Sequence, residues 1–148
     1  MPAFEIVADA GDTANVFEGT VSSITASDGD LLERDAGSTA WTVATAATDN
    51  WQEIAICQGA ITTSLTLVPL IQVTPFMKIR ATSTNDSSAD DNGDRMILSS
   101  KSAVNNTGSN DTSEKSVFIQ DAPSGATGDK KILGHFVLGG AGVDPDAS

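Results

Sequence analysis

The stretch that decides the fold runs from Ile54 to Thr84 and reads IAICQGAITTSLTLVPLIQVTPFMKIRATST. Branched and aromatic side chains dominate it, and these residue types suit the pleated, half-buried surface of a β-sheet. Pro69 and Pro75 exclude one long helix, because each proline removes a backbone donor and favours extended geometry in the residue before it. We therefore predict three strands here, over residues 52–58, 61–67 and 76–83.

The third of these strands alternates most clearly between polar and apolar positions. Met77, Ile79 and Ala81 fall on one face, and Lys78 and Arg80 fall on the other, as the two-residue period of a strand requires. We expect the apolar face to be buried. The residues predicted for the hydrophobic core are Ile54, Ile56, Leu65, Leu67, Ile79, Ile97 and Phe118.

Short segments of strand composition recur through the rest of the chain. Further strands are predicted over residues 3–8, 15–25, 39–45, 95–100, 115–120 and 131–138. Residues 27–38 differ, because they are polar and rich in turn formers, and we expect a loop there with room for one helical turn capped by Asp28 or Asp30. The pattern predicts an all-β fold of about eight strands: an antiparallel jelly roll, a β-sandwich or a small β-barrel.

The chain has 148 residues, an ordinary length for one domain. We expect a single β-domain over residues 9–138. Residues 1–8 are predicted to form either an N-terminal arm or the first strand of that domain. The glycine-rich end, residues 139–148, is predicted to be a flexible C-terminal tail.

Acidic residues outnumber basic ones by 20 to 8, which gives a formal net charge of -12. This balance argues against nucleic-acid partners, where cationic side chains must displace counterions from phosphates. It argues equally against docking on an anionic membrane. The simplest interpretation of the charge is that it keeps the protein soluble. The alternatives are adaptation to high salt and an outer surface that must not adhere to neighbouring molecules.

The chain has one histidine, His135, and one cysteine, Cys57. Both lie in apolar strand segments, so we interpret His135 as a sheet or interface residue and Cys57 as a small buried hydrophobe. The sequence contains neither a nucleophile elbow nor a phosphate-binding loop. We therefore expect no enzymatic activity and no cofactor.

The loop over residues 85–94 reads NDSSADDNGD, and clustered oxygen ligands of this kind suit calcium. Aligning Gly93 with the glycine of a helix–loop–helix calcium site places Ser88 and Ser99 where carboxylates are required, so that motif fails. We interpret the loop as a solvated acidic turn and expect no metal. A carbohydrate- or calcium-binding β-sandwich module, with this loop as its site, is the alternative function.

The N-terminus carries an apolar pattern made of Pro2, Phe4, Ile6 and Val7. A chain end with this much apolar surface is normally held against something. We predict that these residues bind a partner, because a strand added to a neighbouring sheet would satisfy their side chains and backbone donors together. The equal alternative is that they form the first strand of their own domain.

The chain resembles the head decoration (cement) proteins of tailed bacterial and archaeal viruses. The resemblance lies in the opening MPAFEIVADAGD, in PFMKIRATSTND and in the closing KILGHFVLGGAG, within an acidic chain rich in Ala, Thr, Ser and Gly. It covers the whole chain in composition and pattern, and no residue of the family is carried over individually. It implies a protein made in the host cytoplasm that sits on the capsid exterior of the virion as a homotrimer and clamps the major capsid protein.

Overall fold

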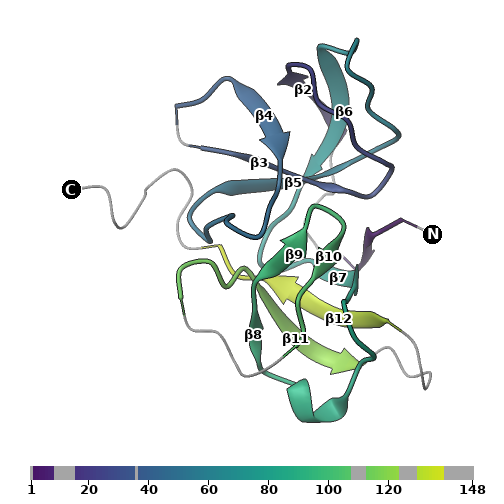
Figure 1. The fold of residues 1–148 in the computed structure, drawn as a ribbon, viewed down its shortest axis with the longest axis vertical. Helices are drawn as coiled ribbons and strands as arrows, with labels where there is room; N and C mark the ends of the chain where they lie inside the picture. Colours follow the sequence, from purple (N-terminus) through teal and green to yellow (C-terminus); the bar gives the residue numbers. More distant parts are fainter. Residues whose placement is uncertain (1, 9–15, 36, 108–112, 124–129, 139–148) are drawn as a thin grey trace.

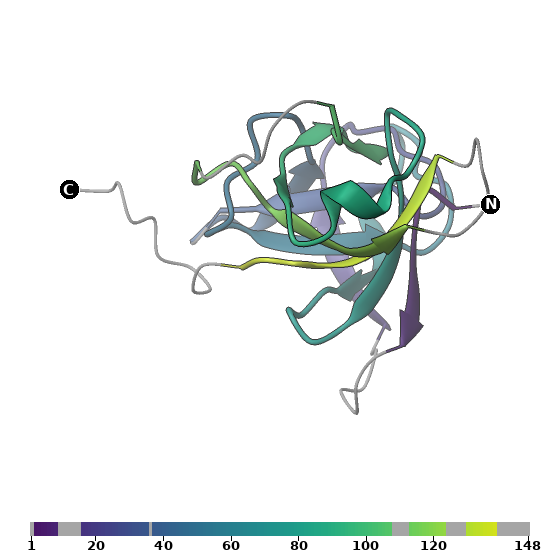
Figure 2. The same ribbon diagram turned by 90° about the horizontal axis from the view of Figure 1, so that it is seen from below.

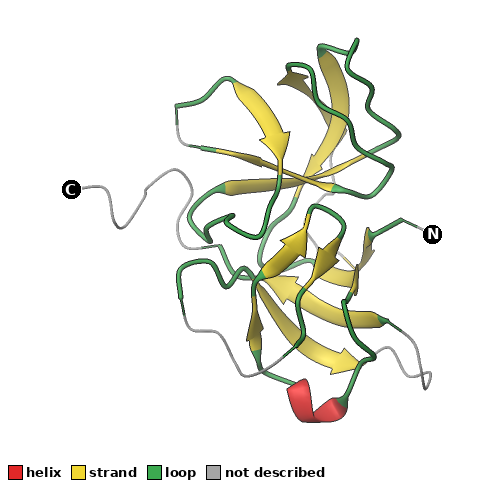
Figure 3. Cartoon of the chain, viewed as in Figure 1, coloured by secondary structure: helices red, strands yellow, loops and turns green. Residues whose placement is uncertain are grey.

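The protein is built almost entirely from β-strands (Figure 3). The computed structural model describes residues 2–8, 16–35, 37–107, 113–123 and 130–138. Besides one turn of 3-10 helix, η1 (Ala89–Asp91), these residues form twelve strands. The strands are β1 (Phe4–Ala8), β2 (Val16–Val21), β3 (Leu31–Arg34), β4 (Ala40–Val43), β5 (Glu53–Cys57), β6 (Leu67–Gln72), β7 (Lys78–Thr82), β8 (Arg95–Met96), β9 (Leu98–Ser100), β10 (Ala103–Val104), β11 (Phe118–Pro123) and β12 (Lys131–Phe136).

The strands are arranged as a closed barrel that packs on an open sheet (Figure 1). The barrel has the order β2-β4-β3-β5-β6, and the five-stranded sheet has the order β1-β7-β12-β11-β8. Strands β9 and β10 form a separate pair. The barrel comes from one continuous part of the chain, whereas the sheet combines the N-terminal strand with strands from the second half. All pairings between the described strands are antiparallel except β2–β4.

The all-β prediction is confirmed, and the small barrel is the alternative that the structure contains. The described residues hold more strands than the eight or so expected, because β3 lies in a segment expected to be a loop and β8, β9 and β10 are only two or three residues long. No helix in the described part of the chain is long and apolar enough to span a membrane. The predicted tail, residues 139–148, lies outside the described residues.

Two hydrophobic cores fill the structure, and β3 and β5 separate them. The barrel interior contains Val21, Ala26, Leu32, Trp41, Ala55, Cys57, Ile61, Val68 and Leu70. The second core lies between the barrel wall and the sheet, and Leu31, Ile54 and Ile56 of the wall join residues of the sheet there, among them Phe4, Ile79, Phe118 and Phe136. Because successive residues of a strand point to opposite faces, β3 and β5 are buried on both sides.

This double burial explains why the expectation of a polar loop over residues 27–38 is wrong. Leu31 and Leu32 are both fully buried and belong to different cores. The segment therefore contains a central strand, β3, with polar turns on either side of it. Asp30 caps no helix; it is buried at the start of the strand.

The strand predicted over residues 61–67 is also displaced, and β6 instead passes through Pro69. The Val73 N–H donates to the Ile54 carbonyl at 3.0 Å. Because the bonding direction alternates along an antiparallel strand, the backbone nitrogens of Ile71 and Pro69 also point towards β5. The nitrogen of Pro69 therefore faces Gln58, just beyond the end of β5, and the Gln58 N–H donates to the Pro69 carbonyl at 2.9 Å. The missing donor costs no bond within the β5–β6 ladder.

The core prediction is confirmed for Ile54, Ile56, Ile79 and Phe118. It is wrong for the other three residues. Leu67 is 55% exposed and Leu65 is 37% exposed, because the first points out of the barrel and the second lies in the turn before β6. Ile97 is half-buried, since it lies between β8 and β9 and its neighbours Met96 and Leu98 occupy the core.

Candidate partner-binding site

The N-terminal segment is part of the five-stranded sheet. Strand β1 pairs with β7 in an antiparallel register that places Phe4 opposite Ala81 and Ile6 opposite Ile79. The Arg80 guanidinium forms an ion pair with the Glu5 carboxylate on the outer face of this pair. In the described chain β1 pairs with β7 only, so it is an edge strand, as Figure 2 shows.

Three contacts hold this segment against β12 and the turn before β3. The Phe4 side chain is buried, with its ring centroid 6.0 Å from that of Phe136. The Phe4 N–H donates to the Gly29 carbonyl at 3.1 Å. Gly29 has φ +84°, and a Cβ atom there would lie 2.3 Å from the Cβ of Pro2. Only glycine allows the turn before β3 to approach Pro2 this closely.

The turn that carries Gly29 is itself fixed by a buried carboxylate. The Ser27 N–H donates to Asp30 Oδ2 at 2.9 Å, and the Ser102 hydroxyl donates to Asp30 Oδ1 at 2.7 Å. The Cys57 thiol donates to the Ser27 carbonyl at 2.8 Å. Burial raises the pKa of that thiol, which keeps it protonated and suited to this donor role. The turn is therefore a rigid support for the N-terminal segment.

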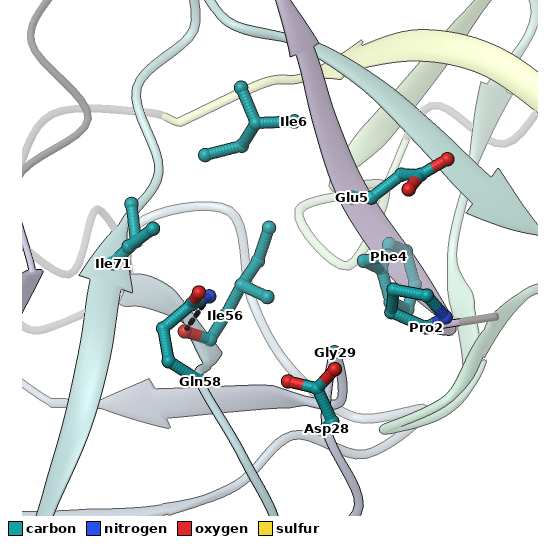
Figure 4. A pocket seen from close by; sticks show the side chains of 9 residues that line it. All are labelled: Pro2, Phe4, Glu5, Ile6, Asp28, Gly29, Ile56, Gln58 and Ile71. Atoms are coloured by element: carbon teal, nitrogen blue, oxygen red, sulfur yellow. Dashed lines mark hydrogen bonds between the residues drawn. The ribbon is translucent and has the colours of Figure 1, made fainter.

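A groove of about 330 Å³ lies between β1 and the barrel (Figure 4). Pro2, Phe4, Glu5 and Ile6 come from the N-terminal segment, Asp28 and Gly29 from the turn, and Ile56, Gln58 and Ile71 from the barrel. The set is largely apolar, and its two charged residues are both carboxylates. A volume of this size is at the lower end of the range of protein ligand pockets.

An exposed apolar surface on the outer wall of the barrel continues from this groove. On β6, Leu67 is 55% exposed, Pro69 is exposed and Ile71 is half-buried. Ile71 pairs across the strands with Val16, which is 58% exposed. Because Ile71 also lines the groove, the wall and the groove form one apolar surface. Surfaces of this kind mark sites of protein association.

The acidic loop over residues 85–94 is a different structure, held by Gln120. The fully buried Gln120 side chain donates from Nε2 to the Ser88 carbonyl at 2.7 Å and to Asn92 Oδ1 at 2.9 Å. Desolvation by burial raises the pKa of Asp91, and the charges of Asp94 and Asp90 raise it further. Among the described residues, no group of three or more His, Cys, Asp and Glu side chains is placed to hold a metal ion.

His135 belongs to an ion cluster on the outer face of the sheet. Its Nδ1 lies 3.0 Å from Asp121 Oδ2, and the Lys78 ammonium lies 2.5 Å from the same oxygen. Burial alone would raise the pKa of Asp121, but the hydrogen bonds and charges of Lys78 and His135 lower it below its ordinary value. This is the environment of a half-exposed sheet residue, in agreement with the interpretation of His135 from the sequence.

The structure brings together three of the four residues predicted to bind a partner. Pro2, Phe4 and Ile6 line the groove, whereas Val7 lies at a bulge in β1, is 42% exposed and takes no part in the lining. Their binding of a partner stays a prediction. Sequence reasoning missed the groove residues contributed by the turn and the barrel: Asp28, Gly29, Ile56, Gln58 and Ile71. The Asp-Gly dipeptide signals a turn, but nothing in the sequence places that turn against Pro2.

Comparison of the sequence with protein-family models gives no match, and comparison with curated proteins gives no significant match either. The functional proposal below therefore rests on the residues and geometry of the groove, together with the composition of the chain.

Proposed function

We propose that this chain is a structural decoration protein that binds the outer surface of a viral head, as a homotrimer, and stabilises the junctions between major capsid subunits. On this proposal the chain is not an enzyme, and its partner is the major capsid protein. The observation that carries the proposal is the apolar groove beside β1 and its continuation over Val16, Leu67 and Ile71. A protein that clamps a shell needs such a surface to exclude water at its contacts.

The charge of the chain supports the same role. A net charge of -12 on a protein that coats a particle would keep coated particles apart by mutual repulsion. The groove lies on one side of a structure whose two cores share the strands β3 and β5. Shared strands couple the barrel to the sheet, so a force applied at the groove is spread over both layers.

The direct test uses heads of the virus whose genome carries this gene, stripped of the chain. Purified chain should bind these heads saturably in cosedimentation, and the coated heads should resist higher temperatures than bare heads. The variant Ile71→Arg should bind more weakly, because it places a charge in the apolar groove. The matched control Leu133→Arg, on the outer face of the sheet, should bind as the original does. Absence of binding to stripped heads would overturn the proposal.

A genomic observation gives a faster answer. A gene for a major capsid protein beside this one supports a role on the head. A catalytic domain fused to this chain in related genes contradicts it and favours a binding module.

A further inference from the structure

The outer edge of β1 carries backbone groups that point away from its own sheet. The Thr82 N–H donates to the Ala3 carbonyl at 2.9 Å, which marks Ala3 and Thr82 as a hydrogen-bonded pair. In an antiparallel ladder such pairs alternate with pairs that exchange no bonds. Glu5 and Arg80 are therefore hydrogen-bonded to each other, and the N–H and C=O groups of Phe4 and Ile6 point outwards.

One of these outward groups is already bonded within the chain. The Phe4 N–H donates to the Gly29 carbonyl, across the outer edge. Gly29 makes only this one backbone hydrogen bond to the edge. Within the described chain, no other strand pairs with β1 on that side. Among the described residues, the C=O of Phe4 and both backbone groups of Ile6 thus form a short unpaired edge of the kind that recruits additional strands.

The groove lies directly beside this edge. Phe4 and Ile6 border it from β1, and Ile56 and Ile71 border it from the barrel, as Figure 4 shows. An extended chain laid along β1 would point alternate side chains in opposite directions. One set would enter the groove between Ile6 and Ile71, where only apolar side chains find matching surroundings.

The charges at the groove indicate the chemistry of the second set of side chains on the added strand, those that do not enter the groove. Glu5 and Asp28 are its only charged lining residues. Arg80 neutralises Glu5 by an ion pair, so the acidic character of the rim comes from Asp28 and from the net charge of -12 of the whole chain. A segment with lysine or arginine between its apolar residues would be attracted to this surface. A second copy of the chain is disfavoured here, because it would bring the same two carboxylates and the same net charge to the contact.

We propose that the outer edge of β1 binds an extended segment of a shell protein as an additional strand of the five-stranded sheet. The segment places apolar side chains in the groove and lysine or arginine side chains against its acidic rim. This inference deepens the proposed function and rests on it for the source of the segment. The mode of binding is β-strand addition, in which main-chain hydrogen bonds give affinity and side-chain pockets give specificity.

The test is a selection from a library of random peptides, with the full chain immobilised. Peptides of about 12 residues are long enough to span β1 and its flanks at about 3.3 Å per residue. We expect enrichment of sequences that alternate apolar residues with lysine or arginine. Binding of the enriched peptides should weaken by about tenfold or more in Ile71→Arg, which buries a charge in the groove, and should be unchanged in Leu133→Arg.

A backbone measurement separates strand addition from side-chain contact alone. Hydrogen exchange followed by NMR should show the Ile6 amide strongly protected when peptide binds. The Glu5 amide, already bonded within the sheet, should change little. Enrichment without protection of Ile6 would overturn strand addition, and so would the absence of any enriched alternating sequence.

Three further outcomes complete the test. Concentration-dependent self-association that Ile71→Arg abolishes would overturn the proposal, since it would make a second copy the occupant of the edge. If the chain coats stripped heads with the Ile6 amide unprotected, strand addition is wrong and the decoration function stands. If peptides bind as described but stripped heads do not, the strand-binding site stands and the decoration function is wrong.

Discussion

Leu31 and Leu32 are neighbours in the sequence, yet their side chains lie in two different hydrophobic cores. Leu31 faces the sheet and Leu32 faces the barrel interior, and both are fully buried. The strand between the cores therefore acts as a shared wall.

This arrangement predicts that both leucines are essential to stability. Leu31→Ala and Leu32→Ala should each lower the free energy of unfolding by about 2–5 kcal/mol, through lost transfer energy and the cavity that remains. Chemical denaturation followed by tryptophan fluorescence measures the change. Leu67→Ala is the matched control, since Leu67 is 55% exposed, and it should change stability by no more than about 0.5 kcal/mol. Equal effects at Leu32 and Leu67 would contradict the assignment of faces.

The close approach of Gly29 to Pro2 predicts a larger cost for Gly29→Ala than for Gly37→Ala. Both glycines have nearly the same φ, +84° and +81°, but a Cβ at Gly37 meets nothing within 4 Å. The left-handed backbone should cost each alanine variant about 1–2 kcal/mol. Gly29→Ala should lose more, because its Cβ displaces Pro2 from the turn. A pair of thermal melts compares them, and indistinguishable melts would show that the N-terminal segment yields without cost.

Deletion of residues 2–7 should destabilise the whole chain. The deletion removes the buried Phe4 ring and the β1–β7 ladder, and loss of a buried phenylalanine side chain alone costs about 3–5 kcal/mol. We expect a loss of cooperative unfolding in calorimetry. Val7→Ser, at an exposed position of the same strand, should melt as the original does. A truncated chain that still melts cooperatively would show that the segment is an independent arm.

Asp121 should make the protein more stable above its ordinary pKa than below it. Burial opposes the charged form, but Lys78 and His135 lower the pKa of this carboxyl below its ordinary value of 3.8 overall. A carboxyl with a lowered folded-state pKa contributes stability above the unfolded-state value and loses it as the pH falls through the folded-state value. Asp121→Asn should therefore lower Tm at pH 7, and the difference should shrink below pH 3.8 as the pH falls through the folded-state pKa and Asp121 becomes neutral. Asp86→Asn, in the exposed loop, is the control.

Glu33 should show the opposite dependence. Burial raises its pKa above the ordinary value of 4.5. Hydrogen bonds from Thr48 and Gln52 oppose the shift, and the charges of Asp35 and Asp49 add to it. A raised folded-state pKa means that the ionised carboxylate destabilises the folded state above pH 4.5. Glu33→Gln should raise Tm at pH 7 and lose that gain as the pH falls through the folded-state pKa towards 4.5. Glu18→Gln, on the exposed face of β2, is the control.

The alternation of β7 could be predicted because one of its faces meets solvent. Met77, Ile79 and Ala81 are buried, and Lys78 and Arg80 point away from the core. Strand β3 could not be predicted, since its two leucines stand between polar turns and only the second core explains why both are buried. The course of β6 through Pro69 depends on where β5 ends, which is a property of the pairing and not of either segment.

The candidate site divides in the same way. Pro2, Phe4 and Ile6 stand out in the sequence as an apolar chain end, and all three line the groove. Ile56 and Ile71 also line it, but in the sequence they belong to an apolar run whose side chains all resemble core residues. They line the groove because the barrel closes, and closure cannot be predicted from the local sequence pattern around either residue.

The pairing of β1 with β7 also sets the order in which the chain can fold during synthesis. The barrel strands lie within residues 16–72 and can close as soon as that part has left the ribosome. Strand β1 emerges before them, yet its partner ends at Thr82, so it must wait beside a finished barrel. Contacts between distant parts of a chain form slowly, because the loop between them must first be closed. During this delay the unpaired strand is open to any other chain that offers an edge, and newly made copies are therefore most prone to mispairing before the sheet is complete.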